Sequence, residues 1–284
     1  MATARPRLVV GVDGSPDADR ALEWALTQAR CLGGVVHVLH GTPSALAVDV
    51  TAGVRDELAE TSRLVIDRAR QLAGTAPGVD VVTSEVATDG AAALVGASEG
   101  AWAVVVGARG HGRLAGALLG SVSQHVTRHA ASPVVVVREP ADRSSRTVVV
   151  GVDTEGTSRH AVAFALDVAQ SRSAPVLAVR AWHQPSRFVA PGPVLLPELT
   201  AEQRAAEVEL LERDLASARS AHAGVVVSVD VVPGHPQRVL TDASQHAGLV
   251  VVGSRGRGGF AGLLLGSVSQ ALLQHAACPV AVAR

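Results

Sequence analysis

An internal repeat is the feature that most constrains how this chain can fold. The segment GARGHGRLAGALLGSVSQ, which begins at Gly107, recurs almost letter for letter as GSRGRGGFAGLLLGSVSQ from Gly253. The beginning of each copy repeats as well, because RLVVGVDG from Arg7 matches TVVVGVDT from Thr147. Each copy is about 140 residues long, which suits one ordinary domain. The sequence therefore predicts two similar domains in tandem.

The boundary between the copies is expected in the polar segment REPADRSSR, from Arg138 to Arg146, which has the composition of a linker. We predict domains at residues 1–140 and 147–284. The second copy is longer between its two motifs. Its insertion is expected in the proline-rich stretch that follows Trp182.

Both copies alternate short valine-rich runs with longer segments of helical periodicity, which is typical of β-α-β units. The predicted fold class is α/β, with two tandem open parallel five-stranded sheets that carry helices on both faces, as in Rossmann-like folds. In the first copy the expected strands are Leu8–Val12, Val35–His40, Val81–Val86, Ala103–Gly107 and Val134–Val137.

Several helix starts are marked by capping residues. Ser15, followed by proline, is expected to cap the first helix. Thr157 or Ser158 takes this place in the second copy. Thr200 and Gln203 form a capping box for a later helix.

Composition excludes several classes of function. The formal net charge is −1 and no arginine run is long enough for a nucleic-acid or membrane surface. All 25 basic side chains are arginine, so lysine chemistry is excluded. Cys31 and Cys278 stand far apart in apolar contexts, which favours reduced core thiols. The N-terminus lacks the apolar region of a signal peptide, so we expect a cytoplasmic protein without a membrane span.

The repeated glycines follow a hydrophobic strand, AVVVG or LVVVG, and precede a helix. Ligands bind at this end of the strands in open α/β sheets. Glycine-rich turns and helix N-termini expose N–H groups that suit a phosphate. Tight packing of helix on sheet is the alternative role for these glycines. The motif residues are Gly107, Gly110, Gly120 and Ser121 in the first copy, and Gly253, Gly256, Gly266 and Ser267 in the second.

Two other phosphate sites are disfavoured. A P-loop needs Gly-Lys-Ser/Thr, and this chain has no lysine. A dinucleotide loop fits G-x-G-x-x-A at Gly110 and Gly256. However, Ala130 and Ala276 stand where the acidic ribose ligand belongs, and the loop follows a late strand.

The spacing G-x2-G-x9-G-S, the early VGVDGS and the two-copy layout resemble a tandem universal stress protein of the ATP-binding type. This resemblance covers nearly the whole chain and implies an adenine-nucleotide α-hydrolase-like fold. It implies that ATP binds, with magnesium or manganese bridging the phosphates, while no metal ligand set is expected from the protein itself. The implied nucleotide contacts are Gly11, Val12, Asp13, Gly41, Val106, Gly107, Gly110, Gly120, Ser121 and Val122 in the first copy, and Gly151, Val152, Asp153, Ala181, Val252, Gly253, Gly256, Gly266, Ser267 and Val268 in the second.

The second copy departs from the pattern where Thr154 replaces Gly14. A β-branched residue tolerates a positive φ badly, so the second pocket is expected to differ. Asp13 has a simpler alternative role as a turn residue, but its recurrence as Asp153 favours a site. The histidines show no repeated ligand spacing. Arg109, Arg113, Arg255 and Arg257 suit either phosphate pairing or solvated loops.

The last strand of each copy, PVVVVR or PVAVAR, is a hydrophobic edge that must be covered. The resembling family pairs these strands across domains. We therefore expect Val134–Val137 and Val280–Ala283 to join the copies face to face as an internal pseudo-dimer, with homodimerisation of the chain left open.

The leading functional hypothesis is a nucleotide-dependent stress regulator or sensor that binds ATP and has no catalytic residues. The regulatory or sensor role is implied by the family resemblance alone. A slow ATP hydrolase is the alternative, although only Asp13 and Asp153 repeat near the motifs as a potential base. A third reading is an assembly module with empty pockets.

Overall fold

The computed structural model describes residues 5–42, 52–111, 118–153, 157–182, 199–255 and 265–284. The described elements of the first half are, in order, β1 (Arg7–Gly11), α1 (Pro16–Leu32), β2 (Val35–Gly41), α2 (Ala52–Gly74), β3 (Asp80–Val86), α3 (Gly90–Ala97), β4 (Ala103–Gly107), α4 (Ser121–His129) and β5 (Val134–Val137). Those of the second half are β6 (Val148–Gly151), α5 (Arg159–Arg172), β7 (Val176–Trp182), α6 (Ala201–Ala221), β8 (Val227–Pro233), α7 (Pro236–Ala243), the 3-10 helix η1 (Ser244–His246), β9 (Leu249–Gly253), α8 (Ser267–His275) and β10 (Val280–Ala283). The α/β class and the strands expected in the first copy are confirmed to within a residue at each end.

The ten strands of the described residues belong to one sheet, in the order β3-β2-β1-β4-β5-β10-β9-β6-β7-β8. Within each half every pair of neighbouring strands is parallel. Helices cover both faces, and the central strands β4 and β5 are buried on both sides and consist almost wholly of valine. The outermost strands β3 and β8 alternate buried or half-buried residues with exposed ones. Hydrophobic runs thus mark the middle of the sheet.

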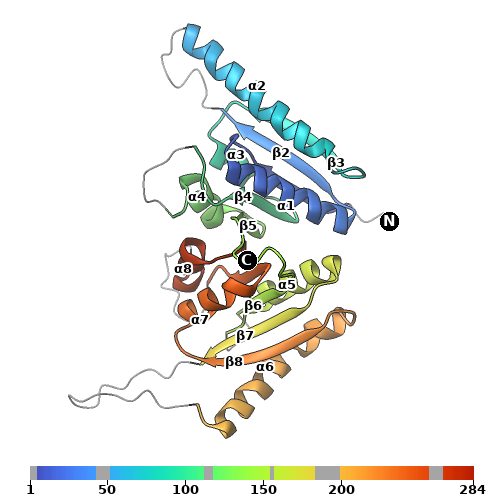
Figure 1. Ribbon diagram of the computed structural model, residues 1–284, viewed down its shortest axis with the longest axis vertical. Coiled ribbons are helices and arrows are strands. Elements are labelled where there is room, and N and C mark those ends of the chain that lie inside the picture. Colours follow the sequence, from blue (N-terminus) through green and yellow to red (C-terminus); the bar gives the residue numbers. More distant parts are fainter. Residues whose placement is uncertain (1–4, 43–51, 112–117, 154–156, 183–198, 256–264) are drawn as a thin grey trace, which may run out of the picture.

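Two hydrophobic cores lie on opposite faces of the sheet. One core gathers the inward sides of α1, α2, α5 and α6, and the other those of α3, α4, α7 and α8. Figure 1 shows this division, with α1 and α5 on one side of the sheet and α4 and α8 on the other. Each core runs through both halves. The halves are therefore parts of one continuous body.

The two halves meet where β5 pairs with β10 in antiparallel orientation. Val136 lies opposite Val280, and Val135 lies opposite Ala281. The last strands of the copies therefore pair with one another, as the sequence predicted. The expectation of two separate sheets joined face to face is wrong, because the strands meet edge to edge and continue one sheet. Pairing edge to edge satisfies the open backbone N–H and C=O groups of both strands.

Two arginines cross this seam in a reciprocal way. Arg138 follows β5 and donates to the carbonyls of Leu273 and Ala276 at the end of α8, the latter at 2.8 Å from Nη1. Arg284 follows β10 and donates to the carbonyl of Thr127 in α4. The last carbonyls of a helix lack partners within the helix and carry partial negative charge. Each half therefore supplies the cation that caps a helix of the other half.

On the opposite face, α1 and α5 pack across the seam. The Arg172 guanidinium lies 4.6 Å from the centroid of the Trp24 ring and donates from Nε to Gln28 at 2.6 Å. Gln28 is fully buried and donates to Ser171. Burial lowers the pKa of Arg172 to about 10. A buried cation with these contacts ties the two helices together.

The helix starts follow the capping residues closely, with one difference. Ser15 caps α1, and Thr200 with Gln203 forms the expected capping box of α6. Ser158 stands at the N-cap position of α5, but its hydroxyl makes no capping bond. It contacts Asp153 instead. The cap position was therefore predictable, whereas the partner of Ser158 was not.

The cysteine prediction is only half right. Cys278 is buried, and burial raises the pKa of its thiol to about 12, which suppresses the reactive thiolate. Cys31 is exposed near the end of α1. It lies on the exposed side of the helix, next to the buried stripe, so its apolar neighbours in the sequence wrongly suggested a buried thiol.

Among the described residues, no helix is long and apolar enough to cross a bilayer.

A histidine near the ends of α5 and α6 gives a prediction on pH. The two ring nitrogens of His222 face acceptors, since Nε2 lies 2.9 Å from Asp167 and Nδ1 lies 2.9 Å from the carbonyl of Ala218. The hydrogen bond to Asp167 raises the pKa of His222. The resulting stabilisation is fully present below about pH 6.5, the ordinary histidine pKa, and is lost as the pH rises through the raised value.

We expect Asp167→Asn to lower the free energy of unfolding near pH 6 by only about 0.5–1 kcal/mol, because Asp167 is half-exposed and screened by solvent. Near pH 9 the loss should be smaller, because more of the His222 side chain is then neutral. Urea unfolding of both proteins at the two pH values measures this difference. An equal effect of the substitution at both values would contradict the charged hydrogen bond.

Candidate functional site

The chain reverses its direction of travel across each half-sheet between β1 and β4. From β1 it proceeds to β2 and β3 on one side, and then returns to β4 and β5 on the other. A crevice forms at the carboxyl ends of strands at such a switch point, where open α/β sheets bind ligands. The Asp13 turn follows β1 and the glycine loop follows β4, so both predicted motifs converge there. The same holds for β6 and β9 in the second half.

Asp13 links the turn after β1 to the glycine loop. Its Oδ1 accepts from the backbone N–H of Ser15 at 3.0 Å, and its Oδ2 accepts from that of His111 at 3.2 Å. A Cβ added at Gly110 would overlap Oδ2. Gly110 therefore lacks a side chain at the point where this carboxylate approaches the loop. Asp13 is half-buried at the end of β1.

A second carboxylate holds the same loop, and the sequence analysis missed it. Asp17 lies in the first turn of α1, is 7% exposed, and accepts from the backbone N–H of Arg109 at 3.1 Å. It also pairs with the Arg109 side chain and with Arg20. An acid in the first turn of a helix is ordinary. No spacing in the sequence marks this contact, because Asp17 and Arg109 are 92 residues apart.

The helix α4 begins at this crevice without a side-chain cap. Gly120 occupies the N-cap position, so Ser121 is the first residue of the helix and not its cap. Ser121 and Val122 are exposed, and the Gly120 N–H donates to the carbonyl of Ala108 at 2.8 Å. In the described part of the first half, no side chain caps this helix. Its first N–H groups therefore face outward as potential donors to an anion.

The glycines of the motif serve two different purposes. A Cβ at Gly107 would lie 2.6 Å from the backbone carbon of Asp17, so this glycine lets α1 pack on β4. The packing reading is therefore supported for Gly107. At Gly120 the nearest atom to an added Cβ lies at 3.5 Å and φ is −73°. Among the described residues, neither a close approach nor the backbone conformation requires a glycine at position 120, since an added Cβ would make only ordinary contacts with the backbone of the loop.

The remaining first-half residues lie around the strand ends. A Cβ at Gly11 would lie 2.6 Å from Leu94 of α3, and one at Gly41 would overlap the backbone of Gly90. Val12 and Val106 are buried, with 8% and 3% of their surface exposed. Gly11 and Gly41 thus allow close packing at the strand ends, and Val12 and Val106 contribute hydrophobic core beneath the crevice.

The second half repeats the layout with Gly266 at the N-cap of α8, and again no described side chain caps the helix. Ser267 is exposed and Val268 is half-buried. Gly253 ends β9, and a Cβ there would lie 3.1 Å from the carbonyl of Arg255. Gly256, Arg257, Arg113 and Thr154 lie outside the described residues, as does the proline-rich stretch expected to hold the insertion.

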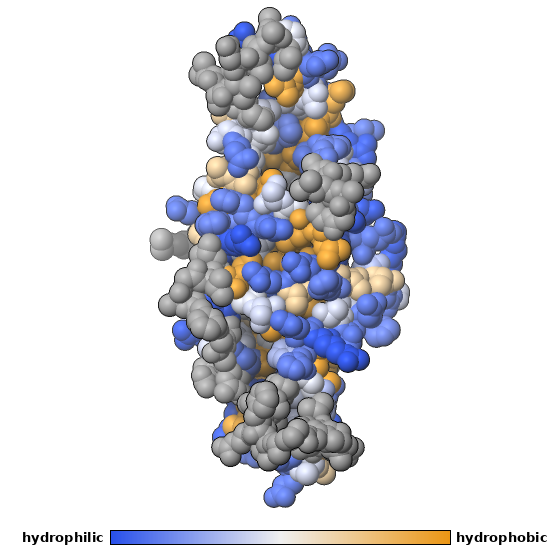
Figure 2. All heavy atoms as spheres, turned by 90° about the vertical axis from the view of Figure 1, so that its left-hand side faces the viewer, coloured by the Kyte–Doolittle hydropathy of each residue, from blue (hydrophilic) through white to orange (hydrophobic). Residues whose placement is uncertain are grey.

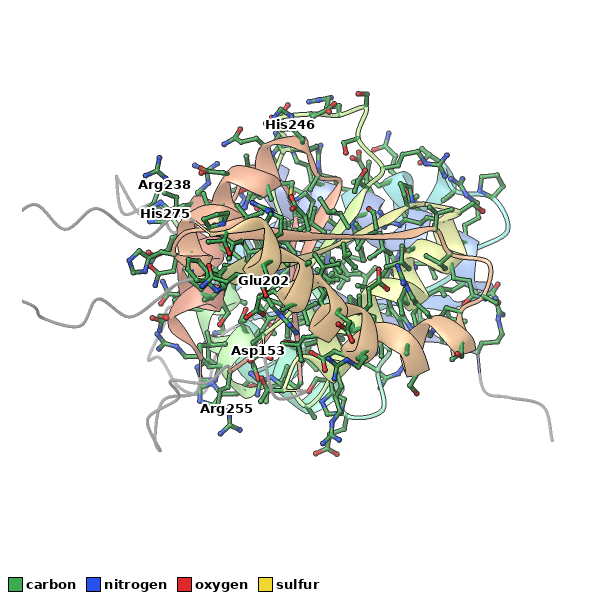
Figure 3. All side chains as sticks on the ribbon, turned by 90° about the horizontal axis from the view of Figure 1, so that it is seen from below. Asp153, Glu202, Arg238, His246, Arg255 and His275 are labelled. Atoms are coloured by element: carbon green, nitrogen blue, oxygen red, sulfur yellow. The ribbon has the colours of Figure 1, made fainter. Side chains whose placement is uncertain are left out.

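Around Asp153 the second half differs. The Asp153 carboxylate accepts from the hydroxyls of Thr157 and Ser158, the latter at 2.7 Å. Gly151 lies against Leu240, Val152 and Val252 are buried, and Ala181 is half-buried at the end of β7. Figure 3 shows Asp153 and Arg255 at the same end of this half.

A buried arginine also distinguishes the second half. Arg180 of β7 is 3% exposed and donates to the backbone carbonyl of Asp153 at 3.2 Å. Its charge is balanced by Asp214 and Glu207 of α6. The sequence analysis missed this residue, although an arginine inside the apolar run VLAVRAW was a signal.

The face that carries α4 and α8 is mostly hydrophilic near the seam, with hydrophobic surface broken into small areas (Figure 2). A hollow of about 490 Å³ lies between α7 and α8 and reaches Ser267. In the described part of the chain, no three His, Cys, Asp or Glu side chains are grouped as a metal site.

Comparison with known proteins agrees with this geometry. The sequence profile of the universal stress protein family matches twice, at residues 5–138 and 144–284. Universal stress protein Rv2005c of Mycobacterium tuberculosis is 39% identical over 291 residues, covering 98% of this chain and 96% of that protein. Universal stress protein Rv2623 of the same species is 37% identical, with coverage of 98% and 96%.

Among solved structures, a universal stress protein from Archaeoglobus fulgidus aligns with a TM-score of 0.72 at 21% identity. The alignment covers 98% of this chain and 96% of that one. At this level of identity the likeness concerns the fold.

Proposed function

Because this chain belongs to the universal stress protein family and carries two of its domains in tandem, we propose that it binds an adenine nucleotide, ATP foremost, at the crevice of its first half. The observation that carries the proposal is the start of α4. There a helix N-terminus without a side-chain cap begins at a glycine, so no side chain at the N-cap covers its first N–H groups. Among the described residues, no close contact or backbone strain requires that glycine.

The chemistry of the crevice suits the two ends of a nucleotide. The free N–H groups at the start of α4 and the Ser121 hydroxyl are donors for phosphate oxygens. The Asp13 carboxylate is an acceptor for ribose hydroxyls at the end of β1. Because Asp13 also holds His111, a ligand that binds Asp13 changes the position of the loop. Magnesium or manganese bound between the phosphates would offset their charge near Asp13 and Asp17.

We further propose that the chain acts as a binding protein in the stress response and not as an enzyme. Hydrolysis requires a base aimed at the attacking water. Asp13 and Asp17, two carboxylates that contact the described part of the loop, accept instead from the N–H groups of His111 and Arg109. These bonds favour a role for Asp13 and Asp17 in positioning the loop. Partners would sense the loop and the exposed start of α4, whose arrangement depends on the occupied site.

Analysis of the purified protein tests the proposal. We expect mass spectrometry of the small molecules released on denaturation to find intact ATP. The protein stripped of nucleotide should show a higher unfolding temperature when ATP and magnesium are added, because a ligand that binds only the folded state stabilises it. Release of ADP or AMP in many turnovers would favour the hydrolase. No released nucleotide together with no thermal shift would contradict nucleotide binding.

A further inference from the structure

We propose that the two halves are not equivalent and that the chain binds one nucleotide, in its first half, because Arg180 and the turn after β6 engage the second-half counterpart of Asp13. This inference rests on the proposed function. It concerns the contacts of Asp153, Thr157, Ser158 and Arg180, all of which the structure describes. Four differences between the halves lead to it.

The first difference is the direction in which the repeated aspartate bonds. Asp13 reaches outward from its turn and bonds the N–H of His111 on the glycine loop. Both oxygens of Asp153 accept from side-chain hydroxyls, at Thr157 and Ser158. The Asp153 N–H also donates to Ser158 Oγ at 2.9 Å. A ligand hydroxyl would therefore compete with two hydroxyls of the protein at Asp153, whereas the described donors to Asp13 are backbone N–H groups.

The second difference lies at the end of the neighbouring strand. The register pairs Gly11 with Leu39 and Gly151 with Val179, so His40 and Arg180 are corresponding residues. His40 bonds the carbonyl of Val12 at 2.8 Å and leaves Asp13 untouched. Arg180 bonds the carbonyl of Asp153 itself. The second half therefore holds the main chain of Asp153 with a charged donor, whereas the corresponding residue of the first half bonds the main chain of Val12.

The third difference is that α6 is built to hold this arginine. Asp214 and Glu207 pair with Arg180 across the core. By the offset that relates Gly107 to Gly253, the α2 position corresponding to Asp214 is Arg68, which pairs with Asp19 at the start of α1. At this position α6 therefore carries an acid where α2 carries a base. Because a buried guanidinium without partners is costly, Arg180 and the α6 acids form one unit.

The fourth difference concerns the support of the glycine loop. Asp17 holds the backbone and side chain of Arg109 in the first half. Its counterpart is Thr157, which bonds Asp153 and has no charge to pair with Arg255. Helix α5 also begins at Arg159, three residues later than α1 relative to the aspartate. The second half has therefore replaced the acid that positions the loop.

Titration of the full-length, nucleotide-free chain with ATP and magnesium tests the inference by calorimetry. We expect about one site per chain. The matched substitutions Asp13→Asn and Asp153→Asn remove the same charge from corresponding turns. Asp13→Asn should weaken binding by at least about tenfold, and Asp153→Asn should change the dissociation constant by less than about twofold.

The place of the bound nucleotide is a second measurement that does not depend on variants. Photolabelling of the wild-type protein with 8-azido-ATP, followed by peptide mapping, should mark the first half. Two sites of similar affinity, or label spread equally over both halves, would overturn the inference and leave the proposed function standing. Absence of any binding would overturn the proposed function, and this inference with it.

The double substitution Arg180→His and Thr157→Asp tests the cause. It gives the second half the residues that correspond to His40 and Asp17. We expect the number of sites to rise above one, while circular dichroism shows a folded protein. A folded double variant that still binds a single nucleotide would show that these two residues do not set the inequivalence.

Discussion

Replacing Gly120 with glutamate is expected to abolish nucleotide binding by the first half while the protein remains folded. A Cβ at this position meets its nearest described atom at 3.5 Å, an ordinary contact, so the first carbon of the side chain fits without a shift of the backbone. The carboxylate would stand at the N-cap of α4, among the N–H groups proposed to bind phosphate. It would compete for those donors and repel the phosphates. We expect a loss of at least about 100-fold in affinity, or roughly 2.7 kcal/mol.

Gly120→Ala is the matched control, because it adds the Cβ without the charge. We expect the alanine variant to keep the wild-type unfolding temperature without ligand and to lose less than about tenfold in affinity. Calorimetric titration with ATP and magnesium measures all three proteins. If the glutamate variant bound ATP as the wild type does, the phosphates would have to lie elsewhere, and the assignment of the α4 start would be wrong.

The second large effect is expected at the seam, from Val135→Asp. Val135 is fully buried, lies opposite Ala281 in β10, and pairs with Val105 on its other side. A carboxylate placed there without a partner should lower the free energy of unfolding by about 3–5 kcal/mol. Total stabilities of domains are only about 5–15 kcal/mol, so this is a large fraction.

Val226→Asp is the control for the seam substitution, since Val226 is 74% exposed and the same change there should be nearly neutral. Urea unfolding followed by tryptophan fluorescence reports both halves, through Trp24 and Trp102 in the first and Trp182 in the second. We expect the Val135→Asp protein to unfold at lower urea, with the two halves no longer unfolding together. Equal midpoints for the two variants would contradict a continuous sheet.

Much of the fold was predictable because it depends on patterns that are local in the sequence. The valine runs of β4 and β5 were placed with correct ends, and Ser15 and Thr200 marked helix starts. The repeat gave the tandem organisation, and the family resemblance implied the pairing of the last strands. It did not give their edge-to-edge geometry, which depends on how whole faces of the two halves pack.

The candidate site was predictable in its position and only partly in its contacts. The switch point follows from strand order, so the convergence of Asp13 with the glycine loop could be anticipated. The division of the glycines into Gly107, where a Cβ would clash with α1, and Gly120, where a Cβ would make only ordinary contacts, needs three-dimensional distances. The roles of Asp17 and Arg180 were missed for the same reason. Each acts on a segment distant in sequence, where no spacing rule applies.

The reciprocal arginines at the seam bear on how the protein behaves at low concentration. A chain with only one half would expose its last strand and the end of its fourth helix until a second chain arrived. Here the connection between β5 and β10 through the second half holds Arg138 and Arg284 near their targets at a fixed effective concentration. Dilution therefore cannot separate the two halves, and the number of binding crevices per particle does not depend on how much protein the cell makes.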